Sequence, residues 1–398
     1  MRESGNVVRI GVCVGTRPEA IKLAPVARAL AGSPGLAASL LFAGQHRELA
    51  EGMLGWFDLR PALCLDVMTE GQTVSGVLSR LLARIEGPLL EGGYSAVVVQ
   101  GDTATAYGCA LAAFLQQIPV IHVEAGVRTS RPDAPFPEEM FRRMIDQLAT
   151  LRFPATASAG ANLAREGLSC EVPTGNTGID ALEWTLERLD RLDAPRAGAG
   201  DREPATGEPA TGVPVHGVPV NGRPVVLVTA HRRESIGEPL RRICEAVARL
   251  SGEAPEVDIV LPVHPNPQVA DTVRGRLGAL PRVHLTEPLD YPSMVQVLRR
   301  SRLVLTDSGG VQEEIAHLGI PGLVLREVTD RPEGVRAGFL EVVGTGTEEI
   351  VGAALRVLRN GSPLLRAAAS PYGDGRAAAR IAARLAAYLG CASGAGSG

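Results

Sequence analysis

Carboxylates and arginines gather between Gln100 and Arg142, in the segments QGDTATAYG, HVEAGVRT and APFPEEMFRR. Asp102, Glu124 and Glu138 each follow a hydrophobic run or open a predicted helix. Carboxylates placed in this way can transfer protons or stabilise a sugar cation. Taken singly, each acid could equally cap a helix. The elements that position the acids decide between these interpretations.

The composition sets the broad class of the protein. A length of 398 residues predicts about two domains, and 45% hydrophobic with 21% charged residues is typical of globular chains. The net charge of −4 argues against a nucleic-acid partner, and no apolar run reaches membrane-spanning length. The six scattered cysteines form no CxxC pair, and the first residues show no secretory signal. We therefore expect a cytoplasmic protein without a membrane partner.

Strands and helices are predicted to alternate in two series. The first series has strands near 7–14, 38–43, 96–100 and 120–123 and a further strand–helix passage over about 151–167. The second has strands near 224–229, 258–262, 283–285, 303–306, 322–325 and 340–343. Four Pro/Gly-rich pentads within residues 193–222 are typical of a linker. The pattern predicts an α/β protein with two doubly wound, Rossmann-like domains at 1–192 and 223–373. Ligands of such sheets bind at the carboxyl ends of the strands, so facing domains would bring the polar motifs to one cleft.

A glycine pair in the second series suits a diphosphate. Ser308, Gly309 and Gly310 precede a helix and offer backbone N–H groups with little steric hindrance, although a simple glycine turn would look the same. Glu314, about one turn further on, could accept both hydroxyls of a ribose. His231 and Arg232 follow another strand and add cationic donors.

The first strand–helix junction offers a second anion site. Arg17 opens the helix, and Lys22 lies about one turn further in. Lys22 is the only lysine among 40 Lys and Arg residues. This favours the interpretation that the position needs a compact charge, which the planar guanidinium of arginine does not provide. The alternative is that the lysine survives by chance. The sequence has no GxGxxG fingerprint and no group of His and Cys residues with the spacing of metal ligands. Neither a cofactor nor a metal is therefore predicted.

Eleven motifs in order resemble one known family. They are GTRPEAIKLAP, GQHRE, GDTATA, HVEAGVRT, PFPEE, TGNTGIDAL, TAHRRES, PVHPNP, TDSGGVQEE, TDRPEGVRAG and PYGDG. The chain resembles the non-hydrolysing UDP-N-acetylglucosamine 2-epimerases over nearly its whole length outside the linker and tails. The resemblance implies a glycosyltransferase-B type fold, with a C-terminal helix at about 374–390 packing back on the first domain. It also implies interconversion of UDP-GlcNAc and UDP-ManNAc, a step of amino sugar biosynthesis.

The resemblance assigns roles to residues of this chain. Catalysis would fall to Lys22, Asp102, Glu124, Glu138 and His231. The UDP-sugar would be held by Arg17, Arg142, Arg232, His264, Ser308, Gly309, Gly310 and Glu314, and a second, activating UDP-GlcNAc would bind near Gln45 and His46. Which carboxylate acts on which face of the sugar stays open. The expected partners are the UDP-sugar and a second copy of the chain in a homodimer.

The sequence also departs from the family pattern. Ser130 to Asp133 replace the usual residues after the Arg-Thr motif, and Phe141 replaces an asparagine. These changes leave the identity of the sugar and the activation by UDP-GlcNAc open. The alternatives are a hydrolysing relative that releases UDP and free sugar, a retaining glycosyltransferase, and a UDP-sugar-binding protein without turnover.

Overall fold

The chain folds around two parallel β-sheets, each in its own compact unit. The computed structural model describes residues 7–44, 52–69, 71–129, 131–133, 135–193, 222–230, 232, 235–361 and 370–391. The first unit comprises Met1–Ala181 and Tyr372–Gly398, and the second comprises Leu182–Pro371. The prediction of two Rossmann-like domains is confirmed.

The first unit contains a sheet with the order β3-β2-β1-β4-β5-β6. Its strands are β1 (Val8–Val14), β2 (Leu36–Phe42), β3 (Leu63–Cys64), β4 (Tyr94–Gln100), β5 (Val120–Val123) and β6 (Leu151–Phe153). All neighbouring strands pair in parallel. The central strands are buried along most of their length because helices cover both faces. The strand order changes direction between β1 and β4, which is where such sheets bind ligands.

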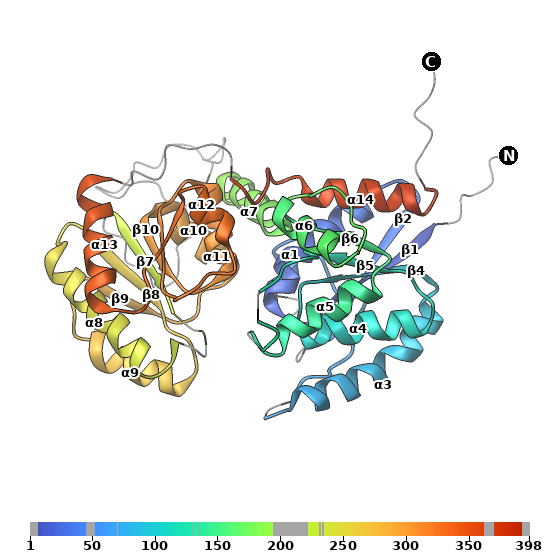
Figure 1. Ribbon diagram of the computed structural model, residues 1–398, viewed down its shortest axis with the longest axis horizontal. Helices are drawn as coiled ribbons and strands as arrows, with labels where there is room; N and C mark the ends of the chain where they lie inside the picture. Colours follow the sequence, from blue (N-terminus) through green and yellow to red (C-terminus); the bar gives the residue numbers. More distant parts are fainter. Residues whose placement is uncertain are drawn as a thin grey trace, which may run out of the picture. The chain divides into compact units, whose positions relative to one another are not determined.

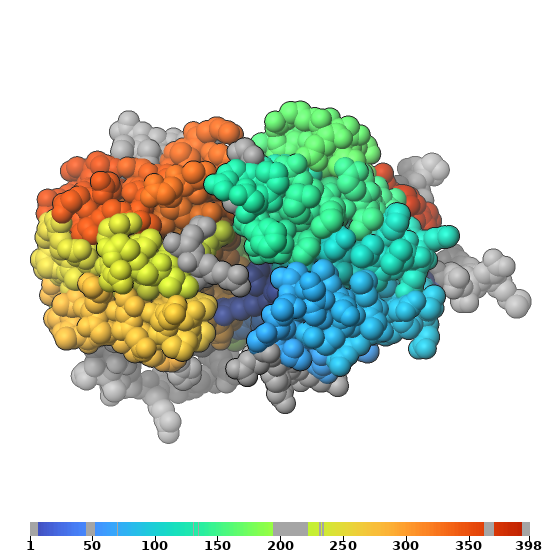
Figure 2. Space-filling model, turned by 60° about the horizontal axis from the view of Figure 1, so that its bottom comes forward, coloured from blue at the N-terminus to red at the C-terminus, as the bar shows by residue number. Residues whose placement is uncertain are grey.

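Helices cover the two faces of this sheet in separate groups (Figure 1). On one face, α1 (Arg17–Ala31) packs beside α14 (Ala377–Tyr388) over a shared apolar core. On the other face lie α3 (Val74–Gly92), α4 (Ala104–Leu115) and α5 (Glu138–Leu148). Figure 2 shows the outer surface that α3 and α4 form, in blue and cyan. The helices α6 (Ala157–Arg165) and α7 (Thr177–Asp193) follow β6.

The second unit repeats the architecture with the order β12-β11-β10-β7-β8-β9. Its strands are β7 (Val225–Thr229), β8 (Asp258–Pro262), β9 (Val283–Thr286), β10 (Ser301–Thr306), β11 (Gly322–Val324) and β12 (Leu340–Val342). One face packs on α8 (Glu238–Glu253), α9 (Pro267–Leu277) and α13 (Thr347–Asn360). The other face carries α10 (Tyr291–Arg300), α11 (Gly309–Leu318) and α12 (Pro332–Arg336), as Figure 1 shows.

Sequence reasoning missed the shortest elements. The edge strand β3 has two residues and α12 has five, so neither develops a periodic pattern. The division between the units falls inside α7, ahead of the boundary expected at residue 192. Most of the predicted linker, residues 194–221, lies outside the described residues.

The C-terminal helix is anchored to the first unit by a buried carboxylate. Asp180 accepts the backbone N–H groups of Ala377 at 3.1 Å and Ala378 at 2.8 Å, at the start of α14. The backbone N–H of Asn176 donates to the carbonyl of Tyr372 at 2.7 Å, which fixes the approach to the helix. Burial raises the pKa of Asp180 to about 6, although the two N–H groups oppose the shift. Burial of this carboxylate therefore makes the free energy of unfolding depend on pH.

We expect the substitution Asp180→Asn to remove a pH-dependent decrease in the free energy of unfolding. Because the Asp180 carboxyl binds its proton more tightly in the folded than in the unfolded chain, its ionisation between about pH 4 and pH 6 lowers the free energy of unfolding, by up to about 3 kcal/mol. Relative to the variant, the wild-type protein should lose stability as the pH rises through this window. Urea unfolding at several pH values measures the difference.

Asp374→Asn is the matched control for this experiment. The hydrogen bond from Arg380 lowers the pKa of Asp374 to about 2, so this group stays ionised throughout the window. Its charge is the smallest of the causes that raise the pKa of Asp180, so Asp374→Asn should keep most of the wild-type loss of stability between pH 4 and pH 6. Parallel pH curves for wild type and Asp180→Asn would contradict the prediction.

Candidate active site

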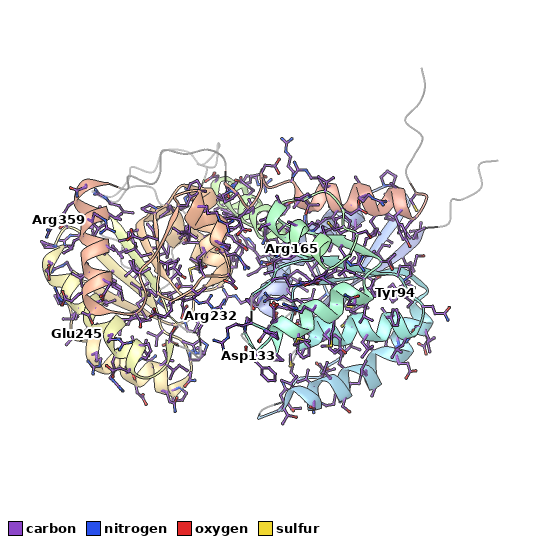
Figure 3. All side chains as sticks on the ribbon, viewed as in Figure 1. Tyr94, Asp133, Arg165, Arg232, Glu245 and Arg359 are labelled. Atoms are coloured by element: carbon purple, nitrogen blue, oxygen red, sulfur yellow. The ribbon has the colours of Figure 1, made fainter. Side chains whose placement is uncertain are left out.

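The predicted acids of the first unit follow its strands at the carboxyl end of the sheet. Asp102 lies just after β4, Glu124 directly follows β5, and Glu138 is the first residue of α5. Figure 3 shows that Asp133, in the loop between β5 and α5, lies at the opposite end of this unit from Tyr94 at the start of β4. The chain thus brings these acids to one edge, as the strand pattern predicted.

The lone lysine of the chain contacts one of these acids. The Nζ atom of Lys22 lies 2.6 Å from Oε2 of Glu124, and the side-chain amide of Gln100 donates to the same oxygen at 2.6 Å. The two charged side chains are only 12% and 9% exposed, so water screens the pair weakly. Glu124 adopts a positive φ of 64°, a backbone conformation that is uncommon for residues other than glycine and often occurs at functional sites. The carboxylate is therefore held in a defined position.

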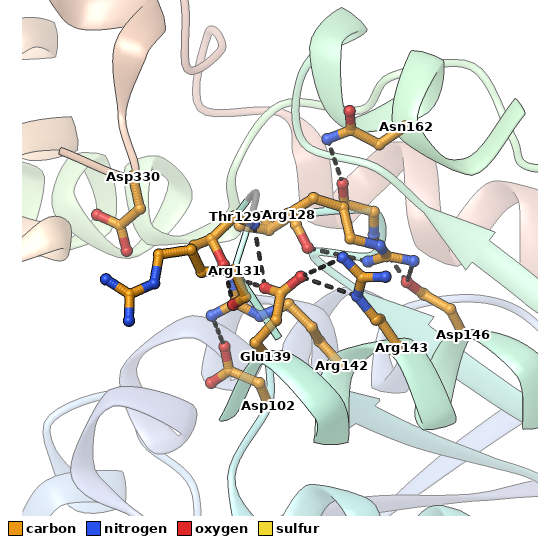
Figure 4. Close-up of polar contacts among 12 residues, drawn as sticks. Asp102, Arg128, Thr129, Arg131, Glu139, Arg142, Arg143, Asp146, Asn162 and Asp330 are labelled. Carbon is orange, nitrogen blue, oxygen red and sulfur yellow. Dashed lines mark hydrogen bonds and ion pairs between the residues drawn. The ribbon is translucent and has the colours of Figure 1, made fainter. Parts of the chain in front are cut away.

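A second ion pair joins Asp102 to α5 (Figure 4). The Nη2 atom of Arg142 donates to Oδ2 of Asp102, and its Nη1 lies 3.4 Å from Glu139. Glu139 is fully buried and also accepts the backbone N–H of Thr129 at 3.1 Å. Arg142, which the family resemblance assigns to UDP, is thus an ion-pair partner of Asp102 in this unit.

Glu138 differs from the other acids in its hydrogen bonding. Its Oε2 atom is buried, yet it has no hydrogen-bond partner among the residues that the structure describes. Buried polar atoms are nearly always paired in folded proteins, so an exception calls for an explanation. A carboxyl oxygen that can still accept or donate a proton suits a role in proton transfer.

The turn between β1 and α1 uses its own carboxylate. The side chain of Glu19 accepts the backbone N–H groups of Gly15 at 2.9 Å and Thr16 at 2.6 Å, and the hydroxyl of Thr103 at 2.6 Å. Burial raises the pKa of Glu19, and these hydrogen bonds oppose the shift. The amides expected to bind an anion here are therefore already taken, and Arg17 remains as an exposed side chain at the start of α1. The Thr-x-x-Glu capping box was a visible signal of this arrangement.

The second unit presents the predicted diphosphate cradle at α11. Ser308 caps this helix without a side-chain capping bond, and a Cβ added at Gly310 would meet no atom within 4 Å. A Cβ at Gly309 would lie 3.5 Å from the guanidinium of Arg331. Arg331 itself pairs with Glu313. Sequence reasoning did not assign a role to Arg331, which adds a positive charge beside the amides of this helix start.

Glu314 is positioned by a buried tyrosine. The hydroxyl of Tyr291 donates to Oε1 of Glu314 at 3.0 Å, and the two residues are 8% and 9% exposed. Burial raises the pKa of the Tyr291 hydroxyl well above its usual value, and the neighbouring Glu314 adds to the shift. Tyr291 therefore stays a hydrogen-bond donor that orients the carboxylate of Glu314.

A buried acid, Asp307, holds the loop after β7 through hydrogen bonds. Asp307 accepts the backbone N–H of Arg232 at 2.9 Å and the hydroxyl of Ser235 at 2.9 Å. In Figure 3, Arg232 lies on the other side of the second unit from Glu245 and Arg359. After β8, the Nδ1 atom of His264 accepts the backbone N–H of Asn266 at 3.1 Å, which leaves a neutral ring its proton on Nε2.

Three of the predicted site residues, His231, Gln45 and His46, lie outside the described residues.

A pocket of about 350 Å³ opens in the second unit, within the lower range for small-ligand sites. It is lined by Ser235, Pro239, Arg242, Leu325, Arg326, Glu327, Val328 and Thr345. Within the described part of the chain, no group of three or more His, Cys, Asp or Glu side chains could hold a metal, and no helix is long and apolar enough to span a membrane.

The chain is similar along nearly its whole length to proteins of one family. The profile of the family described as UDP-N-acetylglucosamine 2-epimerase matches residues 28–386. The UDP-N-acetylglucosamine 2-epimerase of Salmonella typhimurium is 40% identical over 371 residues, covering 92% of this chain and 95% of that relative. The crystal structure of the Neisseria meningitidis UDP-GlcNAc 2-epimerase bound to UDP-GlcNAc superposes with a TM-score of 0.84 at 33% identity, covering 95% of this chain and 99% of that one. The S. aureus MnaA-UDP co-structure gives 0.83 at 36% identity, covering 96% and 97%.

We expect Gly15→Ala to destabilise the β1–α1 turn. A Cβ at this position would lie 2.2 Å from Oγ1 of Thr105, so the start of α4 would have to move. The free energy of unfolding should fall by about 1 to 3 kcal/mol, the usual cost of overpacking. The control is Gly32→Ala, whose Cβ would meet its nearest atom at 3.5 Å. Urea unfolding of both variants tests this, and equal stabilities would refute the steric argument.

Proposed function

The chain belongs to the UDP-N-acetylglucosamine 2-epimerase family, and we propose that it inverts C2 of UDP-GlcNAc or a close relative. The observation that carries this proposal is the pairing of Lys22 with Glu124 at 2.6 Å, at the sheet edge where Asp102 follows β4 and Glu138 begins α5. The pair places a carboxylate and a compact cation together in a weakly screened setting. Such a setting suits proton transfer coupled to the loss of an anionic leaving group.

The proposed reaction proceeds by elimination and re-addition. The proton on C2 of the sugar has no adjacent carbonyl to acidify it, so direct removal is difficult. Departure of UDP, with the electron pair of the C1–O bond, leaves an oxocarbenium-like centre at C1 that makes the C2 proton acidic. A carboxylate then takes this proton, and the C2–H electron pair forms the double bond of a 2-acetamidoglucal. A proton added to C2 from the opposite face and attack of UDP on C1 complete the inversion.

We assign the proton and cation chemistry to the first unit. Asp102, Glu124 and Glu138 are the candidate proton carriers, and Glu138 is supported by its buried oxygen without a partner among the described residues. Lys22 is assigned to the departing diphosphate, because a point charge stabilises the growing negative charge. Arg142 orients Asp102 through their ion pair.

We assign UDP binding to the second unit. The helix start at Ser308, Gly309 and Gly310 would receive the diphosphate, with the Arg331 guanidinium beside it. Glu314 would accept the ribose hydroxyls, since the Tyr291 hydroxyl already orients its carboxylate. Solved structures of two relatives contain UDP-GlcNAc and UDP, which supports a UDP-sugar as the ligand.

Incubation with UDP-GlcNAc in D₂O should place deuterium at C2 of both epimers. The proton removed from C2 exchanges with solvent before another is added, so the label enters during inversion. Proton NMR of the recovered UDP-sugars measures it. Net release of UDP with free sugar would indicate hydrolysis instead. Absence of both label and release would show that UDP-GlcNAc is not the substrate, and a panel of other UDP-sugars would follow.

Glu124→Gln should lower C2 exchange by about 10²- to 10⁴-fold, because the amide cannot carry the proton. UDP binding, measured by calorimetry, should change little, since we assign Glu124 to the proton of the sugar and not to UDP. Glu341→Gln is the control, because Glu341 pairs with Arg356 on the surface. Wild-type exchange rates in Glu124→Gln would remove this residue from the mechanism.

A further inference from the structure

A fully buried histidine lies behind the acids of the first unit. His122 belongs to β5 and is 0% exposed. Its Nδ1 lies 2.6 Å from Oδ1 of Asp146, and its Nε2 lies 2.9 Å from the carbonyl oxygen of Gly101. None of the roles assigned above involves this residue.

The partners of His122 determine which atoms donate. The carbonyl of Gly101 can only accept a hydrogen bond, so Nε2 must carry a proton. Asp146 also accepts the backbone N–H of Gly126 at 3.2 Å and lies 2.7 Å from Nη2 of Arg128. Burial opposes its ionisation, but the charges and hydrogen bonds of His122 and Arg128 outweigh this effect and lower the pKa of Asp146. Two donors other than His122 point at Asp146, and one of them is the charged guanidinium of Arg128, so Asp146 is an ionised acceptor and Nδ1 carries a proton as well.

One branch of this network fixes the residue before Asp102. Gly101 has a positive φ of 71°, and its N–H donates to the carbonyl of Val123 at 3.1 Å. Its carbonyl accepts from His122. The residue that precedes Asp102 is thus hydrogen-bonded to β5 through both its N–H and its carbonyl, so its backbone cannot rotate without breaking one of the two bonds.

The other branch fixes the segment after Glu124. Asp146 holds the N–H of Gly126 and the guanidinium of Arg128, as Figure 4 shows for the arginine. The carbonyl of Gly126 also accepts from the side chain of Asn162 at 2.9 Å. A Cβ at Gly126 would lie 2.3 Å from a backbone oxygen of α6, so the close approach requires glycine.

We propose that His122 is a doubly protonated positioning residue that sets the relative placement of Asp102 and Glu124. Its Nε2–H donates to the carbonyl of Gly101, the residue before Asp102. Its Nδ1–H donates to Asp146, which holds the loop after Glu124. A buried cation is costly, and here an ionised carboxylate and a carbonyl dipole offset the cost. A neutral ring would leave one of its nitrogens facing an acceptor without a proton between them. This role rests on the proposed function, since it places the acids of that reaction.

Two substitutions separate the two branches. In His122→Asn the amide nitrogen takes a position near Nδ1 and keeps the Asp146 contact, whereas in His122→Gln it reaches toward Nε2 and keeps the Gly101 contact. We expect His122→Asn to lower kcat for C2 exchange by about 10- to 100-fold, because misplacing a reacting group by about 1 Å can cost this much. Its KM should change by less than about 3-fold, since UDP binding is assigned elsewhere. His122→Gln should recover part of the lost kcat.

A second His–Asp contact among the described residues provides a control. Nε2 of His284 in β9 lies 3.5 Å from Asp258, and neither residue is assigned to binding or catalysis. His284→Asn should leave kcat unchanged. If His122→Asn keeps the wild-type kcat, or if kcat and KM worsen together with no recovery in His122→Gln, the positioning role is wrong.

A spectroscopic measurement tests the protonation independently of activity. In protein labelled with ¹⁵N-histidine, both ring nitrogens of His122 should show a one-bond coupling to hydrogen, with the signal assigned by its loss in either variant. A bare ring nitrogen would overturn the proposal, whatever the activity of the variants. If the wild type shows no C2 exchange with any UDP-sugar but both nitrogens are protonated, the proposed function fails while the charged network stands.

Discussion

Buried carboxylates that accept backbone N–H groups hold the functional loops of both units. Helices cover both faces of each parallel sheet, so loops at the strand ends cannot be fixed by apolar packing alone. Instead, buried acids bind the loop backbone, with Glu19 at the β1–α1 turn, Asp146 at the loop after β5, Asp180 at the start of α14 and Asp307 at the loop after β7. Each supplies acceptors where irregular backbone would otherwise leave buried N–H groups without partners.

The charge balance around these acids differs between loops. Asp146 lies against both His122 and Arg128, and its pKa is lowered despite burial. The principal partners of Glu19 and Asp180 are neutral N–H and hydroxyl groups, and burial raises their pKa. The loop next to Glu124 is therefore held by an acid whose pKa is lowered, whereas the acid that anchors the C-terminal helix has its pKa raised to about 6.

Sequence reasoning predicted the parts that follow from periodicity and missed those that need three-dimensional contacts. The alternation of buried strands and helices predicted both sheets, and the strand-end rule placed Asp102, Glu124 and Glu138 at one edge. The Lys22–Glu124 contact could not be predicted from spacing, because 102 residues separate the two side chains along the chain. Likewise, His122 looks like one polar residue inside an apolar strand until the carbonyl of Gly101 and the carboxylate of Asp146 are placed beside it.

The residues that depart from the family pattern do not belong to the Lys22–Glu124 and Arg142–Asp102 ion pairs. Phe141 is 7% exposed, and its ring stacks on Tyr107 with centroids 5.1 Å apart and planes 11° apart, so the change replaces a polar side chain with apolar packing between α4 and α5. Arg131 and Asp133 form an ion pair whose side chains are 70% and 69% exposed, and such surface pairs contribute little to stability. Neither change removes a described partner of Asp102 or Glu124. The described ion pairs of Asp102 and Glu124 do not involve the changed residues, which supports the reaction proposed for this chain.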